Sequence, residues 1–186
     1  MEKEELKQRC LDAIDANRDL IIQLGDDVYK TPELGYKEFK TTERMIKAFQ
    51  EIGEEPETEI AYTGCKVSTP KKGNTRIAVI GELDCIQCKE HPDSTPEGNV
   101  HACGHHAQLA DLYGCAIGLL RSGVMKELER IIGRCSNSYE RLSKAKELAA
   151  HLLPVIVPLV VPFTTTLTPI IGSPFLSFTI PCTCNP

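Results

Sequence analysis

Apolar residues recur at helical spacing through the first thirty positions of the chain. Leu6, Cys10, Ile14, Ile21 and Val28 fall on one face of a helix. The pattern therefore predicts one long amphipathic helix over residues 3–29.

Further elements follow in short, well-separated stretches. A second apolar stripe predicts a helix that ends at Gly53, since glycine suits the left-handed turn that commonly ends helices. Residues 65–68 predict a short strand, and residues 71–74 (KKGN) predict a turn. Residues 76–83 (RIAVIGEL) form a nearly continuous apolar run, which is typical of a strand buried on both faces.

The next part of the chain predicts a loop over residues 85–102 and a helix over residues 105–121. Alanine and glycine are frequent in that helix, and small side chains allow it to pack closely on a sheet. The order helix, helix, strand, strand, helix is that of the opening of an α/β layered domain. Functional loops of such domains lie beyond the carboxyl ends of the strands, which is where residues 84–105 fall.

The composition changes abruptly towards the end of the chain. From Leu148 onward there is no Asp, Glu, Lys or Arg, and seven of the 12 prolines lie between Pro154 and Pro186. Residues 129–150 still have a helical pattern. Residues 151–186 predict an irregular, Pro-rich apolar tail, disordered or aberrant, because repeated prolines interrupt both a membrane-spanning helix and a central strand. A membrane tether over residues 152–181 is the alternative that the prolines disfavour.

Charge and cysteine content narrow the class of protein. The net charge is -5 and there is no Lys/Arg run, which predicts that neither nucleic acid nor an anionic membrane is a partner. The N-terminus is charged and lacks the apolar core of a signal peptide, so a cytoplasmic location is expected. The nine cysteines are then expected to be thiols or metal ligands.

The segment 101–106 (HACGHH) is the first candidate for chemistry. Cys103 and His105 lie two residues apart on a loop that leads into a helix, and Gly104 permits a tight path between them. A thiolate and an imidazole so placed could share a metal ion, and this donor set favours zinc. The other interpretation is that Cys103 is a small buried residue and the histidines are ordinary loop residues. The spacing alone leaves both open.

Two carboxylates stand at the end of the apolar run. Glu82 and Asp84 fall on one face of the predicted strand, because alternate strand residues point the same way. A carboxylate there could orient a ligand histidine. The simpler interpretation is that polar residues begin where the strand ends.

Cys85 and Cys88 form a single CxxC motif. A lone CxxC favours two incidental loop cysteines over a redox pair. Together with Cys103 and His105 they could also make a four-ligand zinc site, in a metal-binding or interaction module without catalysis.

Three segments together resemble the aminoacylase and glutamate-carboxypeptidase family of metal-dependent amidohydrolases, in the branch that contains aminobenzoyl-glutamate hydrolase. They are residues 32–43 (PELGYKEFKTTE), 79–86 (VIGELDCI) and 98–110 (GNVHACGHHAQLA). The resemblance covers residues 1–128. It implies that they are the N-terminal part of a zinc-peptidase-like catalytic domain, an α/β domain with helices on a mixed sheet.

The resemblance also implies an activity and a site. The activity is metal-dependent hydrolysis of an amide bond in N-acyl or N-aroyl amino acids or small peptides. Cys103 would bridge two metals, His105 would bind one of them, and the catalytic residue Asp84 would orient a ligand. Glu82 stands where other branches carry a metal-binding histidine. The divalent metal would be zinc, with manganese or cobalt as alternatives, and full-length relatives are expected to be homodimers.

The chain departs from the family in its second half. There is no Glu-Glu pair after residue 55, where the family has its general base and a further ligand, and His151 is the only histidine after His106. Residues 129–150 have no counterpart in the family. We therefore expect a truncated or frame-disrupted product that is inactive or nearly so alone, since a general base contributes about 10²–10⁴-fold in rate.

Overall fold

The structure, a computed structural model, describes residues 3–69, 75–127 and 175–182, the last segment and residues 75–77 by their backbone alone. Its elements, in chain order, are α1 (Lys3–Asp15), α2 (Arg18–Tyr29), α3 (Phe39–Glu51), β1 (Glu57–Ile60), β2 (Gly64–Ser68), β3 (Thr75–Glu82), β4 (Ile86–Gln87), β5 (Asn99–Val100), α4 (His105–Leu120) and β6 (Phe175–Cys182). Among these segments, no helix combines the length and the apolar character that crossing a membrane requires.

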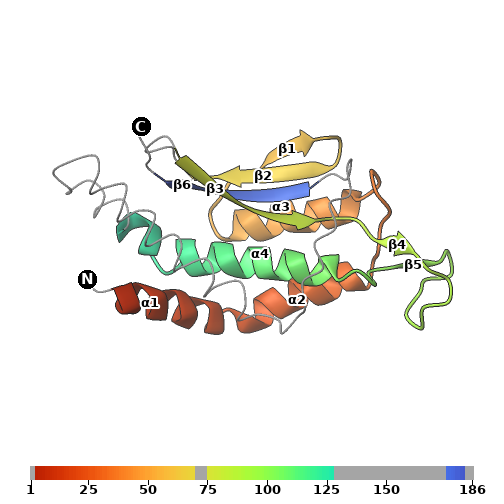
Figure 1. Ribbon diagram of the computed structural model, residues 1–186, viewed down its shortest axis with the longest axis horizontal. Helices are drawn as coiled ribbons and strands as arrows, with labels where there is room; N and C mark the ends of the chain where they lie inside the picture. The colour runs from red at the N-terminus through yellow and green to blue at the C-terminus, as the bar shows by residue number, and fades with distance from the viewer. Residues whose placement is uncertain (1–2, 70–74, 128–174, 183–186) are drawn as a thin grey trace.

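The sheet is mixed and is covered by helices. Its strand order is β1-β2-β6-β3, with β2 parallel to β6 and the other neighbours antiparallel. Helices α3 and α4 lie against one face of the sheet, and α1 and α2 lie behind α4 (Figure 1). The predicted α/β class, with helices on a mixed sheet, is confirmed.

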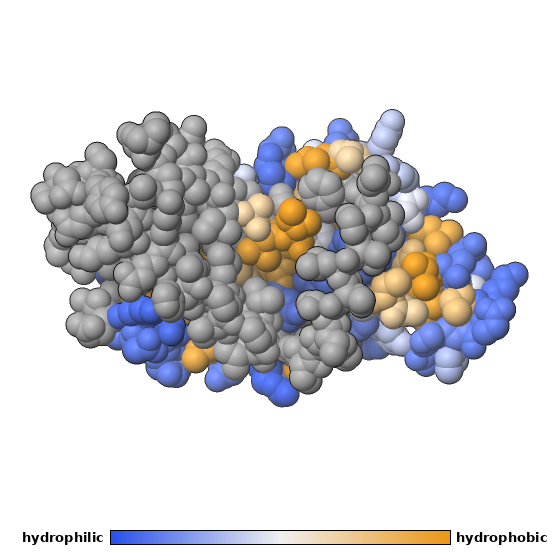
Figure 2. All heavy atoms as spheres, in the orientation of Figure 1, coloured by the Kyte–Doolittle hydropathy of each residue, from blue (hydrophilic) through white to orange (hydrophobic). Residues whose placement is uncertain are grey.

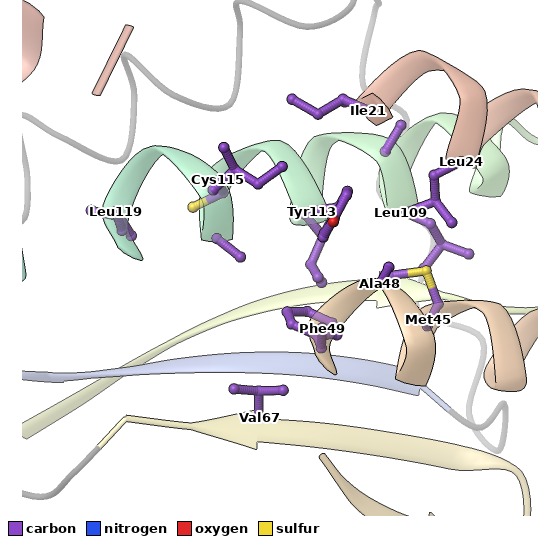
Figure 3. Packing of buried hydrophobic residues seen from close by; sticks show 14 of the residues in the cluster. Ile21, Leu24, Met45, Ala48, Phe49, Val67, Leu109, Tyr113, Cys115 and Leu119 are labelled. Carbon is purple, nitrogen blue, oxygen red and sulfur yellow. The ribbon is translucent and has the colours of Figure 1, made fainter. Parts of the chain in front are cut away.

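Helix α4 lies between the sheet and the outer helices, and its residues are therefore mostly buried. The rings of Phe49 and Tyr113 meet edge to face, with centroids 6.1 Å apart. Figure 3 shows this pair between α3 and α4, with the other apolar side chains of the core around it. Figure 2 shows hydrophobic atoms near the centre of this face and again towards β4 and β5, where hydrophilic residues gather at the end of the molecule.

The helix predicted over residues 3–29 is two helices, α1 and α2, separated at Asn17. The backbone of Asn17 is not helical (φ -117°, ψ 15°), and its side-chain Nδ2 donates to the carbonyl oxygen of Ala13 at 2.7 Å. An Asn side chain that bonds the nearby backbone competes with continuation of the helix. The apolar stripe predicted across the break is nevertheless buried, because both helices pack on α4.

The prediction that residues 76–83 are buried on both faces is wrong. Ile80 is 58 % exposed and Ala78 is exposed, whereas Gly81 is buried against α4. A Cβ at Gly81 would lie 3.1 Å from Leu109 Cδ2, so α4 approaches this face of β3 closely. Over the described residues, helices cover only that face of the strand (Figure 1).

The predicted tail falls only partly on described residues. Phe175–Cys182 forms β6 in the middle of the sheet, so the expectation that its prolines exclude a central strand is wrong for this segment. Strand β6 holds one proline, Pro181, at its penultimate position, where the missing N–H interrupts the ladder least. The turn predicted at residues 71–74, the helix predicted at 129–150 and the remainder of the tail lie outside the described residues.

Candidate functional site

The candidate site lies where β3 ends and α4 begins. Strand β3 ends at Glu82, and Asp84 follows it at the carboxyl end of the strand. Helix α4 starts at His105, directly after Gly104, whose φ of 81° is the left-handed conformation that glycine adopts without strain. Because α4 packs against β3, His105 meets two carboxylates from a distant part of the sequence, Glu82 and Asp84.

Both ring nitrogens of His105 have acidic neighbours. Nδ1 lies 2.8 Å from the main-chain carbonyl oxygen of Asp84 and 3.2 Å from Asp84 Oδ1. Nε2 lies 3.0 Å from Glu82 Oε2. The carbonyl is the nearer acceptor, so the Nδ1 hydrogen is assigned to it. Asp84 Oδ1 then remains an ion-pair neighbour without a hydrogen bond of its own among the described residues. Asp84 therefore contacts the His105 ring directly, as its predicted orienting role requires.

Opposing effects act on the charge of His105, which is only 5 % exposed. Burial alone lowers its pKa, but the contacts of Nδ1 with the Asp84 carboxylate and carbonyl oxygen, together with the charge of Glu82, outweigh burial, and the net pKa is raised. The metal-free site therefore favours a proton on Nε2, between the imidazole and the Glu82 carboxylate. A metal ion bound at His105 Nε2 would lie beside the same Glu82 carboxylate.

Gln108, which the sequence analysis missed, holds Glu82. Its Oε1 accepts the Glu82 N–H at 3.3 Å, and its Nε2 donates to Glu82 Oε2 over a long 3.5 Å. Gln108 follows His105 by three positions, and residues three apart share a face of a helix. The spacing from His105 therefore indicated that Gln108 lies on the same helix face. The local sequence does not indicate that Gln108 contacts Glu82 on β3.

The segment Pro32–Gly35 anchors the loop that carries the site. The Glu33 carbonyl oxygen accepts the N–H of Cys85 at 2.8 Å, directly beside Asp84. The Glu33 side chain binds the start of α3, where Oε2 accepts the N–H of Thr41 at 2.8 Å and its hydroxyl at 3.0 Å. The segment thus joins α3 to the residue after Asp84.

The predicted metal ligand Cys103 is exposed on the loop between β5 and α4. Its interpretation as a small buried residue is therefore wrong. Across the described residues, no three side chains of His, Cys, Asp or Glu come close enough together to hold a metal ion. The structure brings together Asp84 and His105 but assembles no such group around Cys103.

The four-ligand zinc site with Cys85 and Cys88 is not formed either, since all four of its residues are described. Cys85 is buried at the edge of the loop, and burial raises the pKa of its thiol to about 11. Cys88 is half-buried. In the metal-free protein burial thus opposes the thiolate, which is the form that binds a metal.

Two further histidines lie beside the site. His101 is 2 % exposed, and neither of its ring nitrogens has a hydrogen-bond partner among the described residues. Burial lowers its pKa to about 4, and burial also lowers the pKa of His106. The ring of Tyr29 lies 4.7 Å from that of His106, between centroids.

The chemistry of the donors decides whether a metal fits. His105 Nε2 and Glu82 Oε2, 3.0 Å apart, could both reach one divalent ion at bond lengths of about 2.0–2.2 Å. The opposite nitrogen of the imidazole is held by Asp84, as is usual for metal-binding histidines. The described residues thus fit a metal through a pair of ligands, which is fewer than a closed site has.

The chain is similar in sequence to several proteins named as peptidases or hydrolases, although no family model matches it. It is 32 % identical over 112 residues to thermostable carboxypeptidase 1 of Saccharolobus solfataricus, covering 56 % of this chain and 28 % of that protein. It is 34 % identical over 107 residues to N-acetyldiaminopimelate deacetylase of a Geobacillus species, covering 53 % and 27 %. It is 27 % identical over 123 residues to a p-aminobenzoyl-glutamate hydrolase chain of Escherichia coli, covering 58 % and 24 %.

The chain thus spans 24–28 % of the length of these three relatives. Among solved structures, it is similar to a Bacillus subtilis protein described as a dinuclear metal binding peptidase from the M20 family. The TM-score is 0.45 at 20 % identity, and the match covers 60 % of this chain and 33 % of the other.

Proposed function

We propose that this chain carries the first metal-binding elements of an amide hydrolase. Its similarity to a carboxypeptidase, a deacetylase and an aminobenzoyl-glutamate hydrolase supports the proposal. The observation that supports the proposal most directly is the meeting of Glu82, Asp84 and His105 at the carboxyl end of β3. Residues 1–128 would form the N-terminal part of the catalytic domain, and residues 129–186 would be an addition to it.

Each residue of the proposed site has a separate role. His105 binds the metal through Nε2, and Asp84 holds the opposite side of the ring, which fixes the tautomer and the orientation of the imidazole. Glu82 keeps negative charge beside the metal-binding nitrogen. Cys103, on the exposed loop two residues before His105, supplies a thiolate as the second ligand.

A bound divalent metal, zinc or else manganese or cobalt, would supply the Lewis acidity that polarises a scissile carbonyl and activates water. The substrates proposed are N-acyl or N-aroyl amino acids and small peptides, in keeping with the names of the deacetylase and of the aminobenzoyl-glutamate hydrolase. The contribution of this chain is to hold the imidazole and the carboxylates in place before the metal arrives.

We further propose that the chain alone is a poor catalyst. The described residues bring no three possible ligands together, and two protein ligands bind a metal weakly. The same observation favours the alternative function, a metal-binding or interaction module without catalysis. Rapid turnover would exclude this alternative, whereas turnover close to the rate without protein agrees with both.

The test uses the full chain and Co²⁺ as the probe, because a thiolate bound to cobalt gives a near-ultraviolet charge-transfer band that imidazole and carboxylate ligands do not give. We expect this band in the wild type, its loss in Cys103→Ser, and a weaker band in His105→Asn. Cys88→Ser is the matched control, because Cys88 is a half-buried loop thiol outside the proposed site. A wild-type titration without the band would overturn the ligand assignment.

Hydrolysis of N-acetyl amino acids with added zinc, manganese or cobalt is measured on the same proteins. We expect turnover close to the rate without protein. Rapid turnover that Cys103→Ala abolishes would show that the site is complete in this chain, and it would overturn the proposal that the chain alone is a poor catalyst.

A further inference from the structure

His101 and His106 form a second group of ring nitrogens, beside the Glu82–His105 contact but not part of it. The described part of the chain provides no hydrogen-bond partner for Nδ1 or Nε2 of His101 or for Nδ1 of His106. Buried polar atoms in proteins are almost always partnered, and each one left unpaired costs about 1–3 kcal/mol. Three unpaired nitrogens in one place therefore point to a partner that is not a protein group.

The geometry of the two rings suits a shared metal ion. Their centroids are 5.8 Å apart and their planes are tilted by 55°. With metal–nitrogen bonds of about 2.0–2.1 Å, two imidazoles on one ion have their centroids about 5–6 Å apart at ordinary ligand angles. Direct stacking would require nearly parallel planes at a shorter distance, which this pair does not have.

Charges of both signs act on the pair. The carboxylates of Asp26, on α2, and of Asp84 favour a cation there, and a proton on His105 opposes one. Tyr29, also on α2, places its ring against that of His106, which is half-buried. His101, behind it, is almost completely buried.

We propose that His101 and His106 together bind a borderline divalent cation such as Zn²⁺, Co²⁺ or Ni²⁺. Imidazole nitrogen is the ligand that such ions share. Two protein ligands leave positions for water, so we expect weak binding, which depends equally on both histidines. The inference does not rest on the proposed hydrolase function, because neither Cys103 nor His105 takes part.

Co²⁺ titration of the full chain carrying Cys103→Ser tests the proposal. This background removes the thiolate band, so any remaining binding comes from other ligands. We expect a visible ligand-field spectrum without charge transfer, and broadened proton resonances of the Tyr29 ring, which lies 4.7 Å from the His106 ring. Adding His106→Asn should weaken this binding roughly tenfold or more and restore the Tyr29 signals.

His91→Asn is the matched control, because His91 lies in the loop between β4 and β5 and its Nδ1 accepts the N–H of Asp93. It should bind Co²⁺ like the Cys103→Ser parent. His101→Asn should match His106→Asn if circular dichroism shows that it folds; if it does not fold, the half-buried His106 decides alone. Unchanged Co²⁺ affinity in His106→Asn, or Tyr29 signals that saturating Co²⁺ leaves sharp, would overturn the proposal and indicate bridging water as the partner of these nitrogens.

Discussion

His105 donates from Nδ1 to the main-chain carbonyl oxygen of Asp84 at 2.8 Å, a bond between the first residue of α4 and the residue that follows the end of β3 by two positions. A main-chain acceptor does not change its charge with pH, so this bond fixes the orientation of the ring whatever its protonation state. The opposite nitrogen, Nε2, is thereby directed to Glu82. The position of the reactive nitrogen is set by backbone geometry, and its charge is set by a neighbouring carboxylate.

The first prediction concerns that carboxylate in the metal-free protein. Glu82→Gln removes a negative charge 3.0 Å from Nε2, so the pKa of His105 should fall towards the value that burial dictates. A histidine whose folded pKa is raised contributes stability that is full at pH below its unfolded pKa and is lost as pH rises through the folded pKa. The substitution should therefore cost about 1 kcal/mol or less at acidic pH, and little at alkaline pH, because Glu82 is partly exposed.

Titration of the His105 ring protons by NMR measures the shift, and urea unfolding at both pH values measures the stability. Glu90→Gln, on the loop beyond β4, is the control for removing a carboxylate. An unchanged titration of His105 in Glu82→Gln would mean that the contact with Glu82 does not set its charge.

The second prediction concerns Asp111, a half-buried carboxylate on α4. Its Oδ1 has no hydrogen-bond partner among the described residues, and burial raises its pKa to about 6. The folded state therefore binds this proton more tightly than the unfolded state, and the resulting stability is lost as pH rises from the unfolded pKa through about 6. Asp111→Asn should abolish this loss, so that between pH 4 and pH 7.5 the variant gains about 1–2 kcal/mol relative to the wild type.

Urea unfolding at the two pH values checks the trend, which matters more than the absolute stability because the new amide is also half-buried. Asp12→Asn removes an exposed carboxylate from α1 and serves as the control. Parallel loss of stability in the wild type and in Asp111→Asn would show that Asp111 does not titrate in this range.

How much of the fold the sequence predicts depends on how local each signal is. The helical stripes and the apolar run that became β3 were predictable, because periodicity along one element reflects which face is buried. The break at Asn17 was not predicted, since the apolar spacing continues across it and the bond from its side chain to Ala13 leaves no periodic trace. The exposed face of Ile80 was missed for a similar reason, because an apolar run does not state what covers it.

The candidate site divides along the same line. Strand alternation placed Glu82 and Asp84 on one face, and helix spacing placed His105 at the start of a helix, but only the family resemblance assigned roles to Asp84 and His105. Gln108 was missed because its partner Glu82 lies on another element, and only folding brings the two together. The position of β6 was beyond local reasoning as well, since Val67 pairs with Phe178, more than one hundred residues later.

The third prediction concerns the close approach of α2 and α4. A Cβ at Gly25 would lie 3.2 Å from the Cβ of Ala110 and 3.6 Å from the carbonyl oxygen of His106, and neither atom can rotate away. Gly25→Ala should gain about 0.5–1 kcal/mol from helix propensity and lose about 1–3 kcal/mol from overpacking, for a net destabilisation of roughly 1 kcal/mol.

Chemical denaturation of Gly25→Ala, Ala110→Gly and the double variant forms a double-mutant cycle that tests the predicted overpacking. Ala110→Gly should lower stability by itself but should be less harmful in the presence of Gly25→Ala, because it restores the space between the helices. Additive effects of the two substitutions would mean that the helices separate at no cost, and that the contact does not limit their packing.

The last prediction concerns Glu33. Substitution of its side chain should lower the stability of the fold and leave the geometry of the site unchanged. Its carboxylate accepts bonds from the N–H groups of Lys40 (3.2 Å) and Thr41 (2.8 Å) at the N-terminus of α3, where a negative charge is favourable. Glu33→Ala should therefore cost about 1–2 kcal/mol in the free energy of unfolding, and Glu33→Gln about half as much, because the amide keeps one acceptor.

The main-chain bond from the Cys85 N–H to the Glu33 carbonyl oxygen survives both changes. The NMR titration of His105 should consequently stay the same in both variants, in contrast to Glu82→Gln. If Glu33→Ala moved the His105 titration as far as Glu82→Gln does, the Glu33 side chain would shape the site as well as α3, and the division of its roles between side chain and main chain would be wrong.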